Sequence, residues 1–317
     1  FNEIADQLEE RSYNETIDNR FTGLFRFAVG LAKKVLIANV LGEQVDIIFA
    51  MDADSLTTPL AWTGIIAYAF QIYYDFSGYS DMAIGIGRMI GFDFPENFNN
   101  PYISRSITEF WRRWHISLST WLRDYLFLPI AYSTMDRIGN RKPLGIKSEV
   151  WGYCIGIMIT WFLGGLWHGA NWTFVIWGTL HGFYLLVSHI TKKTRKRIVK
   201  RSPLNLNSGI FTFLRVLFIF FLTCIAWVFF RAENITHAFV YLGNLFSKSL
   251  FTAPGSFEFM IYIAIFVLAE WLQRKKEHAL DISGLPVYIR WSIYYVLILV
   301  IILFGDFDQN EFIYFQF

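Results

Sequence analysis

Five long apolar segments restrict what this chain can fold into. Each reaches or approaches the ~20 residues that a helix needs to cross ~30 Å of hydrocarbon. They cover residues 150–167, 172–190, 209–230, 258–272 and 287–305. Because lipid cannot satisfy backbone hydrogen bonds, segments of this kind predict spanning helices. We therefore expect an all-α polytopic membrane protein, folded as one membrane domain over residues 1–317.

The composition also indicates a protein surrounded by lipid. Apolar residues make up 54% of the chain and charged residues 17%, against about 25% charged residues in soluble domains. The formal net charge of +2 gives no indication of a nucleic-acid partner. Cys154 and Cys224 each lie in an apolar run, so no disulfide framework is predicted. The chain opens on Phe1 without a leader, and we interpret it as a fragment that lacks earlier membrane spans.

The segments before residue 100 predict interfacial and re-entrant helices. Residues 24–41 are apolar but contain Lys33 and Lys34, which suits an interfacial helix with snorkelling lysines. Residues 60–74 are strongly apolar, and Gly78 with the hydroxyl residues around it predicts a helix break inside the membrane.

Basic residues in the connecting segments predict the orientation of the chain. Lys and Arg are concentrated in residues 134–148, 192–201 and 273–278, and the second of these segments holds seven of them. Two predicted spans separate each basic segment from the next, so all three segments can lie in the cytoplasm together. The 306–317 segment has no Lys or Arg and is expected on the opposite, extracytoplasmic side of the membrane.

Three histidines accompany these apolar segments. His168 lies in a Gly-rich and Trp-rich turn between two predicted spans, and Asn171 is a plausible N-cap for the returning helix. His181 follows ten residues further on, ~15 Å deeper in that helix. His115 lies in the amphipathic segment 105–128, which is too charged to face lipid on all sides.

These imidazoles suit proton transfer inside a membrane. An ionisable side chain at membrane depth is costly and indicates a functional site, and imidazole titrates near neutral pH. Spread over different depths, the three would line a transmembrane channel. We favour a catalytic role for His168, whereas His115 could instead orient its Arg-rich segment and His181 could be a packed, hydrogen-bonded residue. No spacing typical of a metal site is present.

Five stretches of this chain resemble the bacterial branch of the membrane-bound O-acyltransferase family, the branch that O-acetylates alginate and peptidoglycan. The joint occurrence of the His115 and His168 segments is the most specific part of the resemblance. The matching stretches are Tyr73 to Gly91, Gly91 to Phe98, Phe110 to Leu128, Gly164 to Gly182 and Glu311 to Phe317.

The resemblance implies an acyltransferase of the bacterial cytoplasmic (inner) membrane. Such an enzyme takes an acyl group from a cytoplasmic thioester, acetyl-CoA being the expected donor, and delivers it outside to a cell-envelope polysaccharide. By the same resemblance His168 is the essential histidine and His115 is the second histidine of the bacterial branch. An extracytoplasmic partner of the SGNH, esterase-like type with a nucleophilic serine is also implied.

The resemblance further makes Tyr314 an acyl-accepting residue. The chemistry fits, because a phenolate with a pKa near 10 leaves an ester more readily than a sugar alkoxide does. The alternative is that the aromatic residues of this segment only anchor it at the membrane interface. Three other functions stay open for the chain, namely D-alanyl transfer to teichoic acid, transport and a non-enzymatic scaffold.

Overall fold

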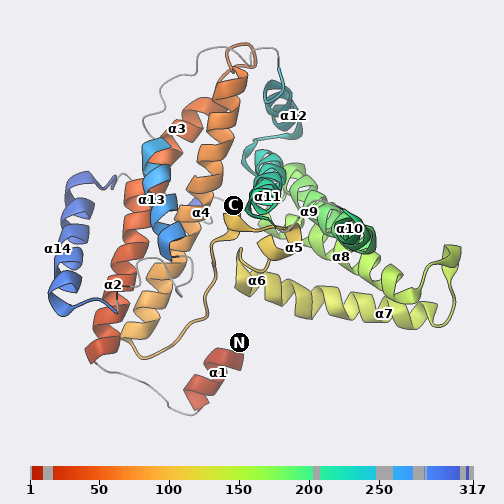
Figure 1. The fold of residues 1–317 in the computed structure, drawn as a ribbon, viewed down its shortest axis with the longest axis horizontal. Coiled ribbons are helices and arrows are strands. Elements are labelled where there is room, and N and C mark those ends of the chain that lie inside the picture. The colour runs from red at the N-terminus through yellow and green to blue at the C-terminus, as the bar shows by residue number, and fades with distance from the viewer. Residues whose placement is uncertain are drawn as a thin grey trace. The chain divides into compact units, whose positions relative to one another are not determined.

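The computed structural model describes residues 2–9, 17–202, 208–247, 260–273, 282, 284–307 and 312–313. These residues form helices and connecting segments, without a strand among them, which confirms the predicted all-α class (Figure 1). They divide into two compact units. Unit 1 comprises residues 1–99 and 244–317, and unit 2 comprises residues 100–243. A single membrane domain over the whole chain stays a prediction.

Unit 1 is built on two helices that lie side by side, α2 (Ile17–Lys33) and α4 (Thr58–Met89). Between them in sequence come the π-helical turn η1 (Lys34–Ala38) and α3 (Asn39–Phe49). On its other side α2 packs its Phe25 and Val29 side chains against α14 (Val287–Phe304). The remaining helices of the unit are α1 (Asn2–Glu9) and α13 (Met260–Gln273).

The predicted break in α4 is wrong, because this helix runs without interruption past Gly78. Gly78 serves close packing instead. A Cβ atom at Gly78 would lie 2.7 Å from the carbonyl oxygen of Gly30 on α2, a distance that real Cβ atoms do not adopt. The two glycines therefore let the backbones of α2 and α4 touch, as small residues do between membrane helices.

The predicted snorkelling of Lys33 and Lys34 is also wrong. Both lysines are buried, and each binds a carboxylate of α4. The ammonium of Lys33 lies 2.8 Å from Asp81 Oδ2, and that of Lys34 lies 2.5 Å from Asp75 Oδ1. Burying a charge is tolerated when an opposite charge pairs with it, so these lysines stay inside the helix pair.

Unit 2 is organised around a hairpin of two long helices, α8 (Ser148–His168) and α9 (Trp172–Ile190). The amphipathic segment before this hairpin forms short elements, and a long apolar helix packs on α9 after it. The other elements are η2 (Pro101–Ile103), α5 (Ile107–Phe110), α6 (Ile116–Trp121), the π-helical turn η3 (Leu122–Phe127), α7 (Leu128–Ile138), η4 (Pro143–Gly145), α10 (Lys192–Arg201), α11 (Gly209–Arg231) and α12 (Ile235–Asn244).

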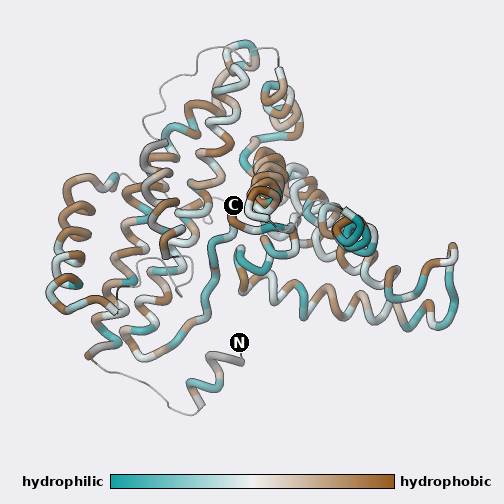
Figure 2. Tube along the Cα trace, viewed as in Figure 1, coloured by the Kyte–Doolittle hydropathy of each residue, from teal (hydrophilic) through white to brown (hydrophobic). Residues whose placement is uncertain are grey.

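In the part of the chain that the structure describes, four helices are long and apolar enough to cross a membrane, namely α8, α9, α11 and α14. Figure 2 shows α11 and α14 as mostly hydrophobic tubes and α10 as a strongly hydrophilic one. The chain is therefore a multi-pass membrane protein, as predicted. The fifth predicted span corresponds to α13, which has 14 described residues.

Candidate active site

His115 occupies a strained turn between α5 and α6. Its backbone is left-handed, with φ 43° and ψ 58°, a conformation that few residues other than glycine adopt. Buried Trp111 and Trp114 hold the turn from the preceding side. On the following side the His115 carbonyl accepts a hydrogen bond of 2.9 Å from the Ser119 backbone N–H. Backbone strain of this kind is costly and often marks a functional site.

His168 is the last residue of α8, and the sharp turn after it depends on Gly169. The φ angle of Gly169 is +157°, and a Cβ atom there would lie 2.8 Å from the ring of Phe174. The Asn171 side chain then accepts a hydrogen bond of 3.0 Å from the Thr173 N–H and caps α9. The N-cap predicted at Asn171 is thereby confirmed.

Aromatic rings surround the buried imidazole of His168. The ring centroids of Trp177, Trp167 and Phe230 lie 4.8, 4.9 and 5.1 Å from that of His168, and all three rings meet it edge to face. These surroundings exclude most water from the imidazole. Water exclusion strengthens every electrostatic interaction that the ring makes with a reacting group.

His181 is fully buried in the same unit, and Trp111 fixes its tautomer. The Trp111 indole donates a hydrogen bond of 3.2 Å to His181 Nδ1. Because an indole N–H can only donate, Nδ1 must be unprotonated, and a neutral imidazole then carries its proton on Nε2. That Nε2 has no hydrogen-bond partner among the described residues. The prediction that His181 could be a packed, hydrogen-bonded residue therefore agrees with the contacts of its Nδ1 atom.

His168 and His181 lie close to each other in unit 2, and the depth of the three histidines in the membrane stays a prediction. The ring of Trp177 touches both His168 and His181, at centroid distances of 4.8 and 5.1 Å. A positive charge on His168 would also act on the ring of His115. Burial and, to a lesser extent, the neighbouring His168 lower the pKa of His115 to about 3. His115 is therefore neutral at physiological pH.

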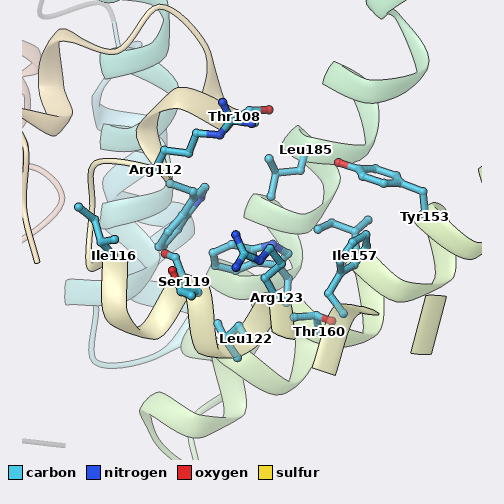
Figure 3. Close-up of a pocket in the computed structure, with 14 residues that line it drawn as sticks. Thr108, Arg112, Ile116, Ser119, Leu122, Arg123, Tyr153, Ile157, Thr160 and Leu185 are labelled. Atoms are coloured by element: carbon cyan, nitrogen blue, oxygen red, sulfur yellow. The ribbon is translucent and has the colours of Figure 1, made fainter. Parts of the chain in front are cut away.

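A cavity of about 540 Å³ lies between the α5–η3 segment and the α8–α9 hairpin, and none of the three histidines is among its lining residues (Figure 3). Trp111 and Trp161 form part of its wall and also contact His181, at centroid distances of 4.9 and 5.7 Å. The two indoles thus separate the cavity from the buried imidazole. A volume of this size can hold a small organic group or part of a larger cofactor.

Thr160 of α8 lines the cavity and carries a buried hydroxyl. Its hydroxyl is buried and has no hydrogen-bond partner among the described residues. Thr134 and Thr223, by contrast, donate to the carbonyl four residues earlier at 2.8 and 2.9 Å, whereas Thr173 of α9 resembles Thr160. A buried hydroxyl without a partner is costly unless a ligand or water satisfies it. The Thr160 hydroxyl is therefore a candidate contact for a bound molecule.

Two arginines place positive charge beside the cavity. Arg112 and Arg123 both line it, and Figure 3 shows them approaching it from the α5–η3 segment. The Arg123 guanidinium also forms an ion pair with Asp124, with 2.7 Å between Nε and Oδ1. Guanidinium groups bind phosphate and carboxylate oxygens well, so this edge of the cavity suits an anionic group.

Unit 1 holds a second polar cluster that the sequence analysis missed. Asp81 of α4 binds both Lys33 and Arg26, at 2.8 and 2.9 Å. Lys33 also approaches Glu270 of α13 at 3.9 Å, and Glu270 accepts a hydrogen bond of 3.0 Å from the Tyr73 hydroxyl. The signal available in the sequence was the occurrence of charged residues in apolar stretches.

Tyr314, the predicted acyl acceptor, lies outside the described residues. The two residues before it in sequence are described, and both contact buried groups of unit 1. The backbone N–H of Ile313 donates to Asp75 Oδ2 at 2.8 Å, and the ring of Phe312 lies 4.5 Å from Lys34 Nζ.

Comparison with known proteins identifies similar sequences along most of the chain. The model of the membrane-bound O-acyltransferase family matches residues 5–231. A probable alginate O-acetylase of Azotobacter vinelandii is 46% identical over 247 residues, which cover 78% of this chain and 44% of the relative. The peptidoglycan O-acetyltransferase of Helicobacter pylori is 42% identical over 74% of this chain and 41% of its own length.

A third relative is more distant. The teichoic acid D-alanyltransferase of Bacillus subtilis is 28% identical over 74% of this chain and 56% of the relative. This chain spans less than half the length of the two O-acetylation relatives that it matches.

Proposed function

Because the chain belongs to the membrane-bound O-acyltransferase family, we propose that it carries the acyl-transfer site of an enzyme that O-acetylates a cell-envelope polysaccharide. The relatives named for alginate and peptidoglycan O-acetylation support the choice of acetyl and of a polysaccharide, since they are 46% and 42% identical. We place the enzyme in the bacterial cytoplasmic membrane. D-alanyl transfer to teichoic acid is the second candidate, supported by a relative at 28% identity.

The observation that carries this proposal is the burial of His168 among aromatic rings beside a second imidazole. Acyl transfer to a hydroxyl needs a neutral base that takes the hydroxyl proton as the new bond forms. His168 is buried and in contact with Trp177, so water does not compete for its ring nitrogens. Trp177 also contacts His181, so a second imidazole lies close to this base.

The reaction that we propose transfers an acyl group from sulfur to oxygen. The oxygen of an accepting hydroxyl attacks the thioester carbonyl, and its proton passes to a ring nitrogen of His168. A C–O bond forms and the C–S bond breaks. The departing thiolate then takes the proton back from the imidazolium, so the products are an ester and a free thiol.

The cavity of unit 2 is our candidate for the donor site. An acetyl-CoA donor carries a thioester at one end of a flexible arm and phosphates at the other. Arg112 and Arg123 suit the phosphates, and the Thr160 hydroxyl suits a carbonyl or amide of the arm. Acetyl-CoA is a substrate in this proposal, and the basic segments that predict the cytoplasmic face would lie on its side of the membrane.

The acceptor that we propose is the hydroxyl of Tyr314 or one supplied by a partner protein. A tyrosyl ester retains transfer potential, because the phenolate is a good leaving group. It can therefore pass the acetyl group to the serine of an extracytoplasmic, esterase-like partner, which then acylates the polymer. Replacing Tyr314 with Phe is expected to abolish acetyl transfer to that serine, whereas undiminished transfer would remove this step.

The proposal is tested in a strain that lacks the gene and expresses the full-length protein as wild type, His168→Gln or His237→Gln. Ester-linked groups are released from the envelope polysaccharides by mild base and identified by mass spectrometry. We expect acetate as the released acid and a loss of at least about 100-fold with His168→Gln. His237 of α12 serves as the matched histidine control and should leave the yield unchanged.

Three outcomes would decide against this function. If a His168→Gln protein that inserts normally gave the wild-type yield of acetate, His168 would not be the general base. That result would favour a non-enzymatic scaffold. Release of D-alanine instead of acetate would favour the second candidate. A transporter would move intact substrates, and labelled acetyl groups would then not appear as esters on the polymer.

A further inference from the structure

Two parts of the 306–317 segment are held against buried polar groups of unit 1. At its start, the backbone N–H of Asp306 donates to the Val35 carbonyl at 2.9 Å, and the Asn39 amide donates to the Asp306 carbonyl at 2.8 Å. Further on, Phe312 and Ile313 contact the Lys34–Asp75 ion pair. Each contact joins residues more than 200 positions apart in sequence, so it forms only when the chain folds.

Asp75 divides its carboxylate between two donors. Its Oδ1 accepts from the Lys34 ammonium at 2.5 Å, and its Oδ2 accepts from the Ile313 backbone N–H at 2.8 Å. The carboxylate is almost completely buried, with 3% of its side chain exposed. A buried carboxylate needs several donors to offset its loss of hydration, and one of them comes here from the 306–317 segment.

The contacts of Lys34 include an aromatic ring. Besides the carboxylate of Asp75, its ammonium faces the ring of Phe312, 4.5 Å from the centroid. A cation over an aromatic face is attracted to it, and more strongly where water is excluded. The Phe312 ring packs edge to face on Tyr79 as well, at 5.4 Å between centroids. The pair therefore recognises a backbone N–H and an aromatic ring on successive residues.

The backbone between α2 and α3 favours these contacts of Lys34 and Val35 with the 306–317 segment. Lys34 begins the π-helical turn η1, where the Asn39 N–H bonds to the Lys34 carbonyl in place of the normal α-helical pattern. Within this turn the Val35 carbonyl accepts from Asp306. Single π-helical turns inside longer helices are rare and frequently lie at functional sites.

We propose that Lys34 and Asp75 are positioning residues that dock Phe312 and Ile313 and thereby restrict the reach of Tyr314 in acyl transfer. Tyr314 follows Ile313 directly in sequence, so whatever fixes Ile313 restricts where the next residue can reach. This inference rests on the proposed function for the role of Tyr314. The docking itself does not depend on that role, and the two can be tested separately.

The test measures docking through the reactivity of a cysteine at position 313. Cys154 and Cys224 are replaced by Ser in the full-length protein, and Ile313→Cys is added to this background. The Ile313 side chain is buried, with 6% of it exposed, so a maleimide should react slowly with the new thiol. The second measurement is the rate of labelled acetyl transfer from acetyl-CoA to the polysaccharide, with position 313 kept as Ile.

The variant that removes the docking pair is Lys34→Met with Asp75→Leu. Both charges are removed together, so neither is left buried without a partner. The matched control is Lys33→Met with Asp81→Leu, which removes a buried ion pair of the same two helices. In the control Arg26 keeps Glu96 as its partner, and Glu270, which loses Lys33, keeps the hydrogen bond from the Tyr73 hydroxyl.

We expect the docking variant to react with maleimide about tenfold faster than the control pair, and to transfer acetyl groups about tenfold more slowly. Equal maleimide reactivity in both pairs would overturn the docking. Faster labelling with an unchanged transfer rate would overturn the positioning role. If Tyr314→Phe transfers normally while the labelling difference persists, the relay through Tyr314 is wrong and the docking stands.

Discussion

At the scale of single residues, the surroundings of the histidines explain why their chemistry differs from that of free imidazole. Burial lowers the pKa of His115 to about 3, and Trp111 fixes the tautomer of His181. The sequence could predict His168 and His115 as candidates, because histidines beside apolar segments are rare and costly. It could not predict Trp111 or Thr160, because their roles arise from contacts between segments distant in sequence.

The first prediction concerns His115 and acid. Its folded pKa is below the unfolded value of about 6.5, so the unfolded state binds the extra proton first. Stability from neutral His115 is therefore complete above pH ~6.5 and is lost, by up to about 1.4 kcal/mol per pH unit, as the pH falls toward 3.

Thermal unfolding in detergent at about pH 7 and about pH 5 checks this dependence. The melting temperature of the wild type should fall more on acidification than that of His115→Gln. Equal falls in both proteins would mean that His115 is as easily protonated in the folded state as in the unfolded state.

The second prediction concerns the hydroxyl of Thr160. Thr160→Val removes a buried hydroxyl that has no partner among the described residues, so the folded protein should lose no stability. The KM for acetyl-CoA should rise about three- to tenfold with kcat unchanged, because one hydrogen bond to the donor is lost. Thr160→Ser keeps the hydroxyl and should behave like the wild type. An unchanged KM for Thr160→Val would place the donor elsewhere.

At the scale of helices, apolar length predicted the spans well and predicted their packing poorly. The helices α8, α9, α11 and α14 begin and end within two residues of the predicted spans. The break expected at Gly78 and the snorkelling of Lys34 were wrong for a common reason. Hydrophobic periodicity describes one segment at a time, whereas Gly78 and Lys34 are explained by the partner helix that each faces.

The third prediction tests the contact of α2 with α4. A Cβ atom at Gly78 would meet the Gly30 carbonyl oxygen at 2.7 Å, so Gly78→Ala must push the helices apart. Overpacking of this kind costs about 1–3 kcal/mol. The melting temperature should fall accordingly. Gly243→Ala is the matched control, because nothing lies within 4 Å of a Cβ atom there, and a fall of equal size in the control would refute the packing argument.

At the scale of the whole molecule, the orientation in the membrane is predicted by the basic segments. The exposed helix α10 holds seven of the basic residues and should lie in the cytoplasm. A cysteine introduced by Thr194→Cys, in a background without Cys154 and Cys224, should react with a membrane-impermeant maleimide only after the cells are permeabilised. Reaction in intact cells would invert the predicted topology.

The family of the chain was predictable because its motifs are short, local and specific. The predicted resemblance to membrane-bound O-acyltransferases is confirmed by the family model over residues 5–231. The contact of both His168 and His181 with Trp177 was not predictable, since helix spacing alone does not show which rings of α8 and α9 meet. The rings of His168 and His181 both pack on the Trp177 indole, at centroid distances of 4.8 and 5.1 Å.

The most direct test of the account is the rate of acetyl transfer by His168→Gln. Inside-out membrane vesicles with the full-length protein receive labelled acetyl-CoA on their cytoplasmic side, and the labelled ester on the polysaccharide is followed over time. The account predicts transfer by the wild type and a rate lower by at least about 100-fold in His168→Gln. Equal rates from equal amounts of inserted protein would contradict it.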